Sequence, residues 1–258
     1  MATAEPDLPV HHFAGADGTE LAYRELGSGR LLVLIHGFVS TGYVNWIKYG
    51  HAKLLASAGY RVVMPDLRAH GDSAKPHDPA AYPPDILTDD GFALLDHLGV
   101  DPAAGGYDLG GYSLGSRTSM RMLVRGARPD RAVLSGMGLS RMLDLSAGVR
   151  FYRRMLENYG TFKHGEPEFM AQAFVRTVGG DPEALLLAIS ANVPTPIEQI
   201  RAIAMPTLVL LGDRDDDHGS GRELAATLVD GTYATIPGNH MGAVARPEMG
   251  QAIAEFLD

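Results

Sequence analysis

Short apolar runs recur along the chain, each about as long as a single buried strand. The clearest runs are Leu31–Ile35, Tyr60–Met64, Arg131–Leu134 and Thr207–Leu211. Runs of this kind, without polar alternation, are typical of strands covered on both faces, as in a parallel sheet. Stretches with helical spacing of apolar residues, such as Asp85–Leu98, separate them. The alternation predicts an α/β fold in which helices flank a mostly parallel central sheet.

Two segments depart from this alternation. Val10–Phe13 and Glu20–Leu26 flank a turn rich in Gly and Asp, which is typical of a β-hairpin at a sheet edge. Residues 138–205 contain amphipathic stretches but no strand-like run, so we expect a helical cap inserted between two strands. The chain would then consist of a core, residues 1–137 and 206–258, and this cap.

Composition and charge narrow the class of protein. Of the 258 residues, 45% are hydrophobic and 21% charged, which is typical of a globular domain with a sizeable core. The formal net charge of −9 argues against a nucleic-acid or an anionic membrane partner. The absence of cysteine excludes disulfides, a thiolate nucleophile and cysteine-ligated zinc. No signal-peptide pattern is visible at the amino terminus, so we expect a cytoplasmic protein. The oligomeric state stays open.

A serine lies in a G-x-S-x-G pattern at Gly111–Gly115. Residues 106–112 can form a strand and residues 115–123 a helix, so Ser113 falls on the turn between them. A sharp turn of this kind needs small neighbours, because its backbone is strained and the adjoining elements pack closely. Ser113 is therefore a candidate nucleophile. On this pattern alone, an ordinary turn in which the serine caps the helix remains the alternative.

A second candidate feature is His36-Gly37-Phe38, directly after an apolar run. A His-Gly pair at the end of a buried strand bends the chain, so the peptide N–H of Phe38 can point into the crevice. Together with the N–H of Leu114 it would form an oxyanion hole. We expect the His36 side chain to satisfy buried backbone groups rather than to act as a base.

An acidic cluster, Asp213–Asp217, follows the last long apolar run. Asp213, Asp215 and Asp217 match the start of a calcium-binding loop, but the required glycine comes one position late, at Gly219. Leu224 stands where the loop needs a bidentate glutamate. We therefore expect no metal and assign one carboxylate of the cluster to orienting a histidine.

The candidate histidine is His240, in a Gly-containing loop after the strand-like Thr232–Ile236. From that place it can reach across the end of a parallel sheet. Other histidines lie at edges, in helices or in loops without a matching partner, and we expect them to be structural or exposed. These are His11, His12, His51, His77, His97 and His164.

Taken in order, these motifs resemble those of the α/β-hydrolase family. The resemblance covers the chain outside the expected cap and implies the fold of that family. It rests on five segments: His36–Phe38, Pro65–Ser73, Gly111–Gly115, Gly212–Asp215 and Gly238–His240. The order of serine, acid and histidine along the chain is also that of the family.

The resemblance implies a catalytic triad of Ser113, Asp215 and His240. The acid is Asp215 because the family's G-x-x-D pattern ends there. In such a triad the histidine takes the serine proton, the carboxylate holds the histidine in the required tautomer, and an acyl-enzyme forms. The N–H groups of Phe38 and Leu114 would stabilise the oxyanion. No metal or organic cofactor is needed.

Two comparisons within the family refine this picture. Haloalkane dehalogenases and soluble epoxide hydrolases are similar but use Asp where this chain has Ser113. The chain itself departs from the family at Ala69, where Gly is usual, and at Gly110-Gly111, where a β-branched residue is commoner before the turn. These departures affect a structural turn and local packing rather than the triad.

Apolar residues of the expected site indicate the substrate class. We expect the pocket to be lined by Phe38, Leu114, Met137, Met155 and Met241, which favours a small neutral ester or lactone as substrate. The leading hypothesis is a serine hydrolase of the carboxylesterase type. One alternative is a carbon–carbon bond hydrolase of diketone-like substrates with the same triad. Another is a small-molecule receptor with little turnover.

Overall fold

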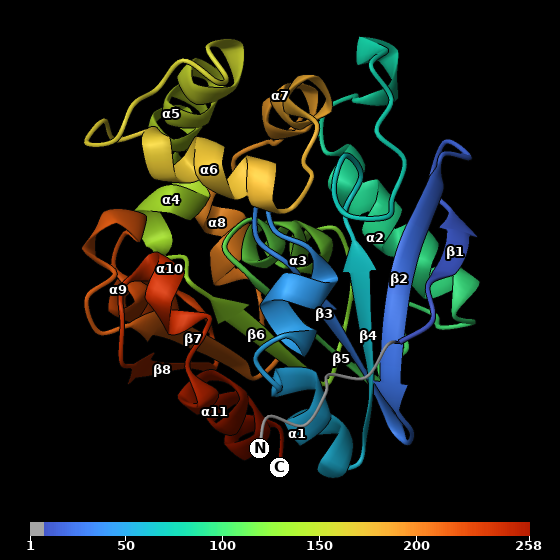
Figure 1. Cartoon of the computed structure of the whole chain (residues 1–258). Helices are drawn as coiled ribbons and strands as arrows, with labels where there is room; N and C mark the ends of the chain where they lie inside the picture. The colour runs from blue at the N-terminus through green and yellow to red at the C-terminus, as the bar shows by residue number, and fades with distance from the viewer. Residues whose placement is uncertain (1–7) are drawn as a thin grey trace, which may run out of the picture.

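One eight-stranded sheet organises the computed structural model, which describes residues 8–258 (Figure 1). The strands are β1 (His11–Ala14), β2 (Glu20–Gly27), β3 (Arg30–Ile35), β4 (Tyr60–Asp66), β5 (Tyr107–Tyr112), β6 (Arg131–Ser135), β7 (Thr207–Gly212) and β8 (Gly231–Ile236). Their order across the sheet is β1-β2-β4-β3-β5-β6-β7-β8. The pairs β1–β2 and β2–β4 are antiparallel and all other pairs are parallel. The predicted fold class, with a hairpin at one edge, is confirmed.

Successive residues of the central strands enter two different hydrophobic cores. In β3, Leu32 and Leu34 belong to one core, and Leu31, Val33 and Ile35 belong to the other. This is the expected result for an apolar run without polar alternation, because side chains alternate between the faces of a strand. Burial on both faces therefore explains the runs seen in the sequence.

Helices cover each face of the sheet. The core that contains Leu32 is closed by α1 (His51–Ser57) and α11 (Pro247–Leu257), and the opposite core by α2 (Ile86–His97), α3 (Leu114–Val124) and α9 (Gly221–Thr227). Outside the segment between β6 and β7, the structure also describes four short helical turns. They are a π-helical turn at Tyr43–Ile47, 3₁₀ turns at Pro79–Ala81 and Asp216–His218, and α10 (His240–Ala243). Within residues 8–258, no helix has the length and apolarity needed to cross a membrane.

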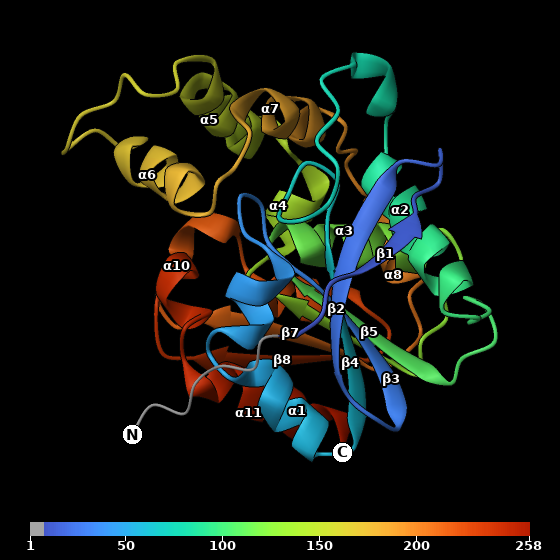
Figure 2. The ribbon, with the colours of Figure 1, turned by 45° about the vertical axis from the view of Figure 1, so that its right-hand side comes forward.

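The chain between β6 and β7 forms helices and no strand. These are α4 (Leu139–Leu143), α5 (Ser146–Glu157), α6 (Phe169–Thr177), α7 (Pro182–Ser190) and α8 (Ile197–Arg201). In both views α5, α6 and α7 gather at one end of the molecule (Figures 1 and 2). The segment predicted as a cap is thus helical, and its role as a cap over the core stays a prediction.

The turn after β4 is held by a buried arginine. Arg68 is fully buried and forms ion pairs with Asp17 at 2.7 Å and Asp90 at 2.9 Å, which connects the edge hairpin to α2. The next residue, Ala69, has a φ of 73°. Glycine adopts this left-handed conformation without steric cost, so Ala69 carries backbone strain that a glycine at this turn would avoid.

Candidate active site

Ser113 lies on a sharp turn between β5 and α3. Its φ is 55°, a conformation that is strained for a residue with a side chain. The turn is possible because a methyl group at Gly111 would overlap the backbone of Gly115, and one at Gly115 would overlap the carbonyl of Ile35. The two glycines of the sequence pattern thus allow the backbone approaches that place the serine at the carboxyl end of the sheet.

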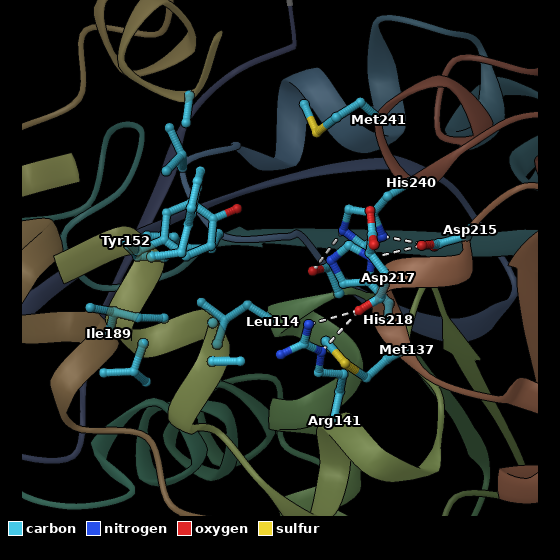
Figure 3. Close-up of a pocket in the computed structure, with 18 of the residues that line it drawn as sticks. Leu114, Met137, Arg141, Tyr152, Ile189, Asp215, Asp217, His218, His240 and Met241 are labelled. Atoms are coloured by element: carbon cyan, nitrogen blue, oxygen red, sulfur yellow. Dashed lines mark hydrogen bonds and ion pairs between the residues drawn. The ribbon is translucent and has the colours of Figure 1, made fainter. Parts of the chain in front are cut away.

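Three predicted residues from three different strand ends form one hydrogen-bonded chain (Figure 3). Ser113 Oγ lies 3.1 Å from Nε2 of His240, and Nδ1 of His240 lies 2.8 Å from Oδ2 of Asp215. Because a neutral histidine has one N–H, donation from Nδ1 to the carboxylate leaves Nε2 as the acceptor for the serine proton. The arrangement can therefore activate a hydroxyl for nucleophilic attack.

The two neighbouring acids, Asp213 and Asp215, have different partners. The Asp215 side chain is almost fully buried and faces His240, whereas Asp213 is half-exposed and its Oδ1 accepts the N–H of Gly238 at 2.8 Å. Asp213 therefore anchors the loop that carries His240. Asp215 is the carboxylate that touches the histidine, as the G-x-x-D pattern predicts.

Sequence reasoning did not identify a second histidine on the same carboxylate. Nδ1 of His218 lies 2.6 Å from Oδ1 of Asp215, and the imidazole rings of His218 and His240 stack at 3.5 Å with an angle of 11° between them. Both oxygens of Asp215 are therefore occupied. The available signal was the spacing, because the 3₁₀ turn at Asp216–His218 brings the third residue after Asp215 back to its side chain.

Burial and the shared carboxylate set the charge state of the site. Burial lowers the pKa of His240 below its usual 6.5, and a charge on His218 lowers it further, against the opposing effect of Asp215. Burial alone would raise the pKa of Asp215, but the hydrogen bonds of His218 and His240 outweigh it and bring that pKa to about 2. At neutral pH the site holds a carboxylate and a neutral base.

The residues that carry the expected oxyanion donors, Phe38 and Leu114, line the same cavity as Ser113. Within residues 8–258, the N–H groups of Phe38 and Leu114 donate to no other group. The preceding residue is fixed, because the Gly37 N–H donates to Oδ1 of buried Asn45 at 2.9 Å. His36 is fully buried and both its ring nitrogens bind backbone groups, so its side chain has the structural place expected.

A cavity of about 740 Å³ opens in front of Ser113. Of the residues expected to line it, Phe38, Leu114, Met137 and Met241 do so. Met155 does not, because it is fully buried on α5 where this helix packs against α7.

Other lining residues come from the helical insertion and from α3, and sequence reasoning did not place them there. Tyr152 packs edge-on against Phe38 with ring centres 4.7 Å apart and closes the pocket on the side away from the triad (Figure 3). Three arginines, Arg117, Arg141 and Arg214, also line it. Arg117 could have been suspected from its spacing, because the fourth residue after Ser113 lies on the same face of α3.

One set of side chains in the described part of the chain could hold a metal ion. The ligand-type atoms of Asp215, His218 and His240 lie within 4.8 Å of one another. Nδ1 of each histidine, however, already lies within hydrogen-bonding distance of a different oxygen of Asp215, at 2.6 and 2.8 Å. The set fits a shared hydrogen-bonded carboxylate better than a coordination sphere.

Comparison with known proteins agrees with the predicted fold. A family model described as alpha/beta hydrolase fold matches residues 30–190. An epoxide hydrolase of Caballeronia sordidicola is 37% identical over 115 residues, which are 45% of this chain and 32% of that protein. The chain matches about a third or less of the length of such curated relatives.

Solved structures match over nearly the whole chain. A hydrolase of Pseudomonas aeruginosa is 24% identical with a TM-score of 0.74, covering 98% of this chain and 99% of that one. A thermophilic esterase of Thermogutta terrifontis is 24% identical with a TM-score of 0.74, covering 96% and 98%. At these identities the likeness shows the fold alone. The family model, in contrast, covers well over half of the chain, which therefore belongs to the alpha/beta hydrolase fold family.

Proposed function

We propose that this protein is a serine hydrolase that cleaves a small carboxylic ester or lactone through an acyl-enzyme on Ser113. The observation that carries the proposal is the hydrogen-bonded chain from Asp215 through His240 to Ser113, at the wall of a cavity of about 740 Å³. The cavity is large enough for a small molecule and largely apolar, which suits a neutral scissile group.

We assign each step of this reaction to a residue of the site. Ser113 Oγ attacks the carbonyl carbon while its proton moves to Nε2 of His240, and Asp215 stabilises the resulting imidazolium. The oxyanion accepts hydrogen bonds from the N–H groups of Phe38 and Leu114. The carbon–oxygen bond then breaks, and the alcohol leaves with the proton from His240. A water molecule, deprotonated by the same histidine, releases the acid and restores the serine.

Some relatives favour a second reaction. Proteins that match parts of this chain are named epoxide hydrolases. Ester cleavage remains the first proposal because the position on the strained turn holds Ser113, with a histidine base directly on its hydroxyl. Carbon–carbon bond cleavage and ligand binding with little turnover would use the same pocket, so both are outcomes of the test.

A serine-directed fluorophosphonate probe tests the nucleophile. We expect one covalent adduct per chain, located at Ser113 by peptide mass spectrometry and lost in Ser113→Ala. The matched control is Ser119→Ala on the same helix, which replaces a buried hydroxyl that has no hydrogen-bond partner and should still label. Labelling of the folded protein at another residue, or none, would overturn the proposal.

A substrate panel tests the reaction. Short acyl esters, lactones, a styrene-type epoxide and a vinylogous diketone are assayed with the wild type and Ser113→Ala. We expect turnover of esters or lactones that depends on Ser113. Turnover of the epoxide or the diketone alone would replace ester cleavage by that reaction, and tight binding without turnover of any substrate would indicate a receptor.

A further inference from the structure

Arg117 is a buried cation without an acidic partner inside the candidate active site. It lies on the first turns of α3, only 9% of its surface is exposed, and it lines the cavity next to Ser113 and Leu114. Nη1 is buried and has no hydrogen-bond partner, and the nearest partner of Nη2 is the sulfur of Met137 at 4.0 Å. Within residues 8–258, Arg117 forms no ion pair.

Arg68, also deeply buried, shows the acidic partners that Arg117 lacks. Arg68 is also enclosed, but Asp17 and Asp90 each contact its guanidinium within 3 Å. A buried charge is unfavourable unless paired, so proteins normally supply such partners. Burial, with a smaller effect of Arg141, lowers the pKa of Arg117 to about 10, against a still smaller opposing effect of the exposed Asp144, which forms no ion pair with it. Arg117 therefore keeps its proton at neutral pH and remains an unpaired cation.

The surroundings of Arg117 do not cancel its charge. Arg141, on α4, uses Nε and Nη2 to bind the backbone carbonyl of Asp217 and forms no ion pair with the described residues. Three acids line the same cavity. The exposed carboxylate of Asp144 accepts from Ser146, and Asp215 is occupied by two histidines, while the third, Asp217, is exposed at the rim. The third lining arginine, Arg214, is exposed and lies 3.6 Å from Asp213. Among the described residues that line the cavity, Arg117 is therefore the arginine that is buried and has neither an acidic nor a carbonyl partner.

We propose that Arg117 binds an ionised carboxylate carried by the substrate, so that the natural substrate is a small ester or lactone with a second, anionic end. The two Nη groups of a guanidinium match the two oxygens of a carboxylate, which suits this group better than a single neutral acceptor. The inference rests on the proposed function and narrows it. It replaces the expectation of a wholly neutral substrate, which was based on the apolar residues alone.

The first test compares two isosteric substrates. The 4-nitrophenyl monoester of glutaric acid ends in a carboxylate, and the corresponding ester of glutaramic acid ends in a neutral amide of the same shape. We expect the wild type to prefer the carboxylate ester at least tenfold in kcat/KM. In Arg117→Met the preference should fall at least tenfold, mainly through a higher KM for the carboxylate ester, and Arg117→Lys should restore part of it.

The control variant is Arg222→Met, which removes the same formal charge from a residue that does not line the cavity and lies over the ring of Tyr233. We expect it to keep the wild-type preference. A wild-type preference of one or less, or a preference that Arg117→Met leaves intact, would overturn the inference.

A second measurement separates this inference from the proposed reaction. Binding of glutarate to Ser113→Ala, which has no nucleophile, is measured by calorimetry with Arg117 present and replaced by Met. We expect at least tenfold weaker binding in the double variant. If the wild type turned over no ester but the variant lacking Arg117 still bound glutarate at least tenfold more weakly, only the proposed function would be overturned. Equal binding would overturn the carboxylate site alone.

Thermal unfolding gives a third readout. If Arg117 were structural, Arg117→Met should lower Tm. Since the guanidinium is buried without a partner, we expect Tm to stay the same or rise, and glutarate to raise Tm in the wild type only. A clear loss of Tm in Arg117→Met would assign the residue to the fold instead.

Discussion

The two oxygens of Asp215 accept hydrogen bonds from two different histidines. None of the other described acids in the same loop forms a hydrogen bond with either histidine. In Asp215→Asn one oxygen becomes an NH₂ group, which cannot accept a hydrogen bond, so one histidine must change tautomer or turn away. We expect kcat to fall by about 10⁴-fold, the scale seen when a triad acid is neutralised. Steady-state kinetics on the best ester of the panel measures this.

The control for that variant is Asp216→Asn, an exposed neighbour that contacts neither histidine, and its kinetics should be those of the wild type. Asp213→Asn should cost little, since an amide oxygen can still accept the Gly238 N–H. If Asp213→Asn is the severe change and Asp215→Asn the mild one, the acid has been assigned incorrectly.

The pKa of His240 determines the acid side of the pH profile. The base acts in its neutral form, and burial lowers its pKa, so kcat/KM should rise with pH and reach half its maximum below pH 6.5. His218→Asn removes the side chain that lowers the pKa of His240 electrostatically, so the midpoint should move to higher pH. A midpoint above 6.5 in the wild type, or a downward shift in the variant, would contradict this account of the site.

At the scale of elements, the close contact of α3 with β3 depends on Gly115. A methyl group there would lie 2.8 Å from the carbonyl oxygen of His36 and would overlap that of Ile35. We expect Gly115→Ala to destabilise the protein by about 1–3 kcal/mol, because backbone atoms would have to move. Urea unfolding measures the change in the free energy of unfolding.

Gly148, in α5, is the matched control. It is also helical, but a methyl group there would meet nothing within 4 Å, so Gly148→Ala should stabilise by up to about 1 kcal/mol through helix propensity. If the two substitutions have the same effect on the free energy of unfolding, the close approach of α3 and β3 does not limit residue 115.

The elements that the sequence predicted well are those with a local signal. Buried strands give continuous apolar runs, and the strained turn gives its two glycines, so the sheet and the position of Ser113 could be predicted. The lining of the pocket could not, because it depends on how helices pack. On α5, Tyr152 lines the cavity, whereas Met155, one turn later, is fully buried in the hydrophobic core. His218 could not be predicted because its place depends on the 3₁₀ turn that brings it back to Asp215. Arg117 could not be predicted because only the folded structure shows that no described acid forms an ion pair with it.

The molecule as a whole contains several histidines that folding keeps neutral. Burial lowers the pKa of His36 to about 4, that of His70 to about 3, and those of His51 and His240 below 6.5. Below pH 6.5 the unfolded chain binds protons that the folded protein does not. Stability is therefore fully present above this pH and lost between it and the folded pKa values, by up to about 1.4 kcal/mol per pH unit for each histidine.

We expect the free energy of unfolding in urea to fall from pH 7 to pH 5, with a slope that corresponds to more than one proton. His51→Gln, which can still donate to the Val244 carbonyl, should make the slope shallower. Substitution of exposed His164 by Gln should leave it unchanged. A free energy that is flat between pH 7 and pH 5 would show that these groups do not titrate on unfolding.

The helices between β6 and β7 form one uninterrupted stretch of chain, bounded by strands that are neighbours in the sheet. In evolutionary terms, this stretch can be lengthened, shortened or exchanged in a single event while the strand ends that carry the serine, the acid and the base keep their register. Selection for a different substrate can then act on the pocket residues contributed by these helices, while the residues that carry out the reaction stay unchanged. Arg117 lies on α3, outside these helices, so the proposed carboxylate site would be retained if the helices were exchanged.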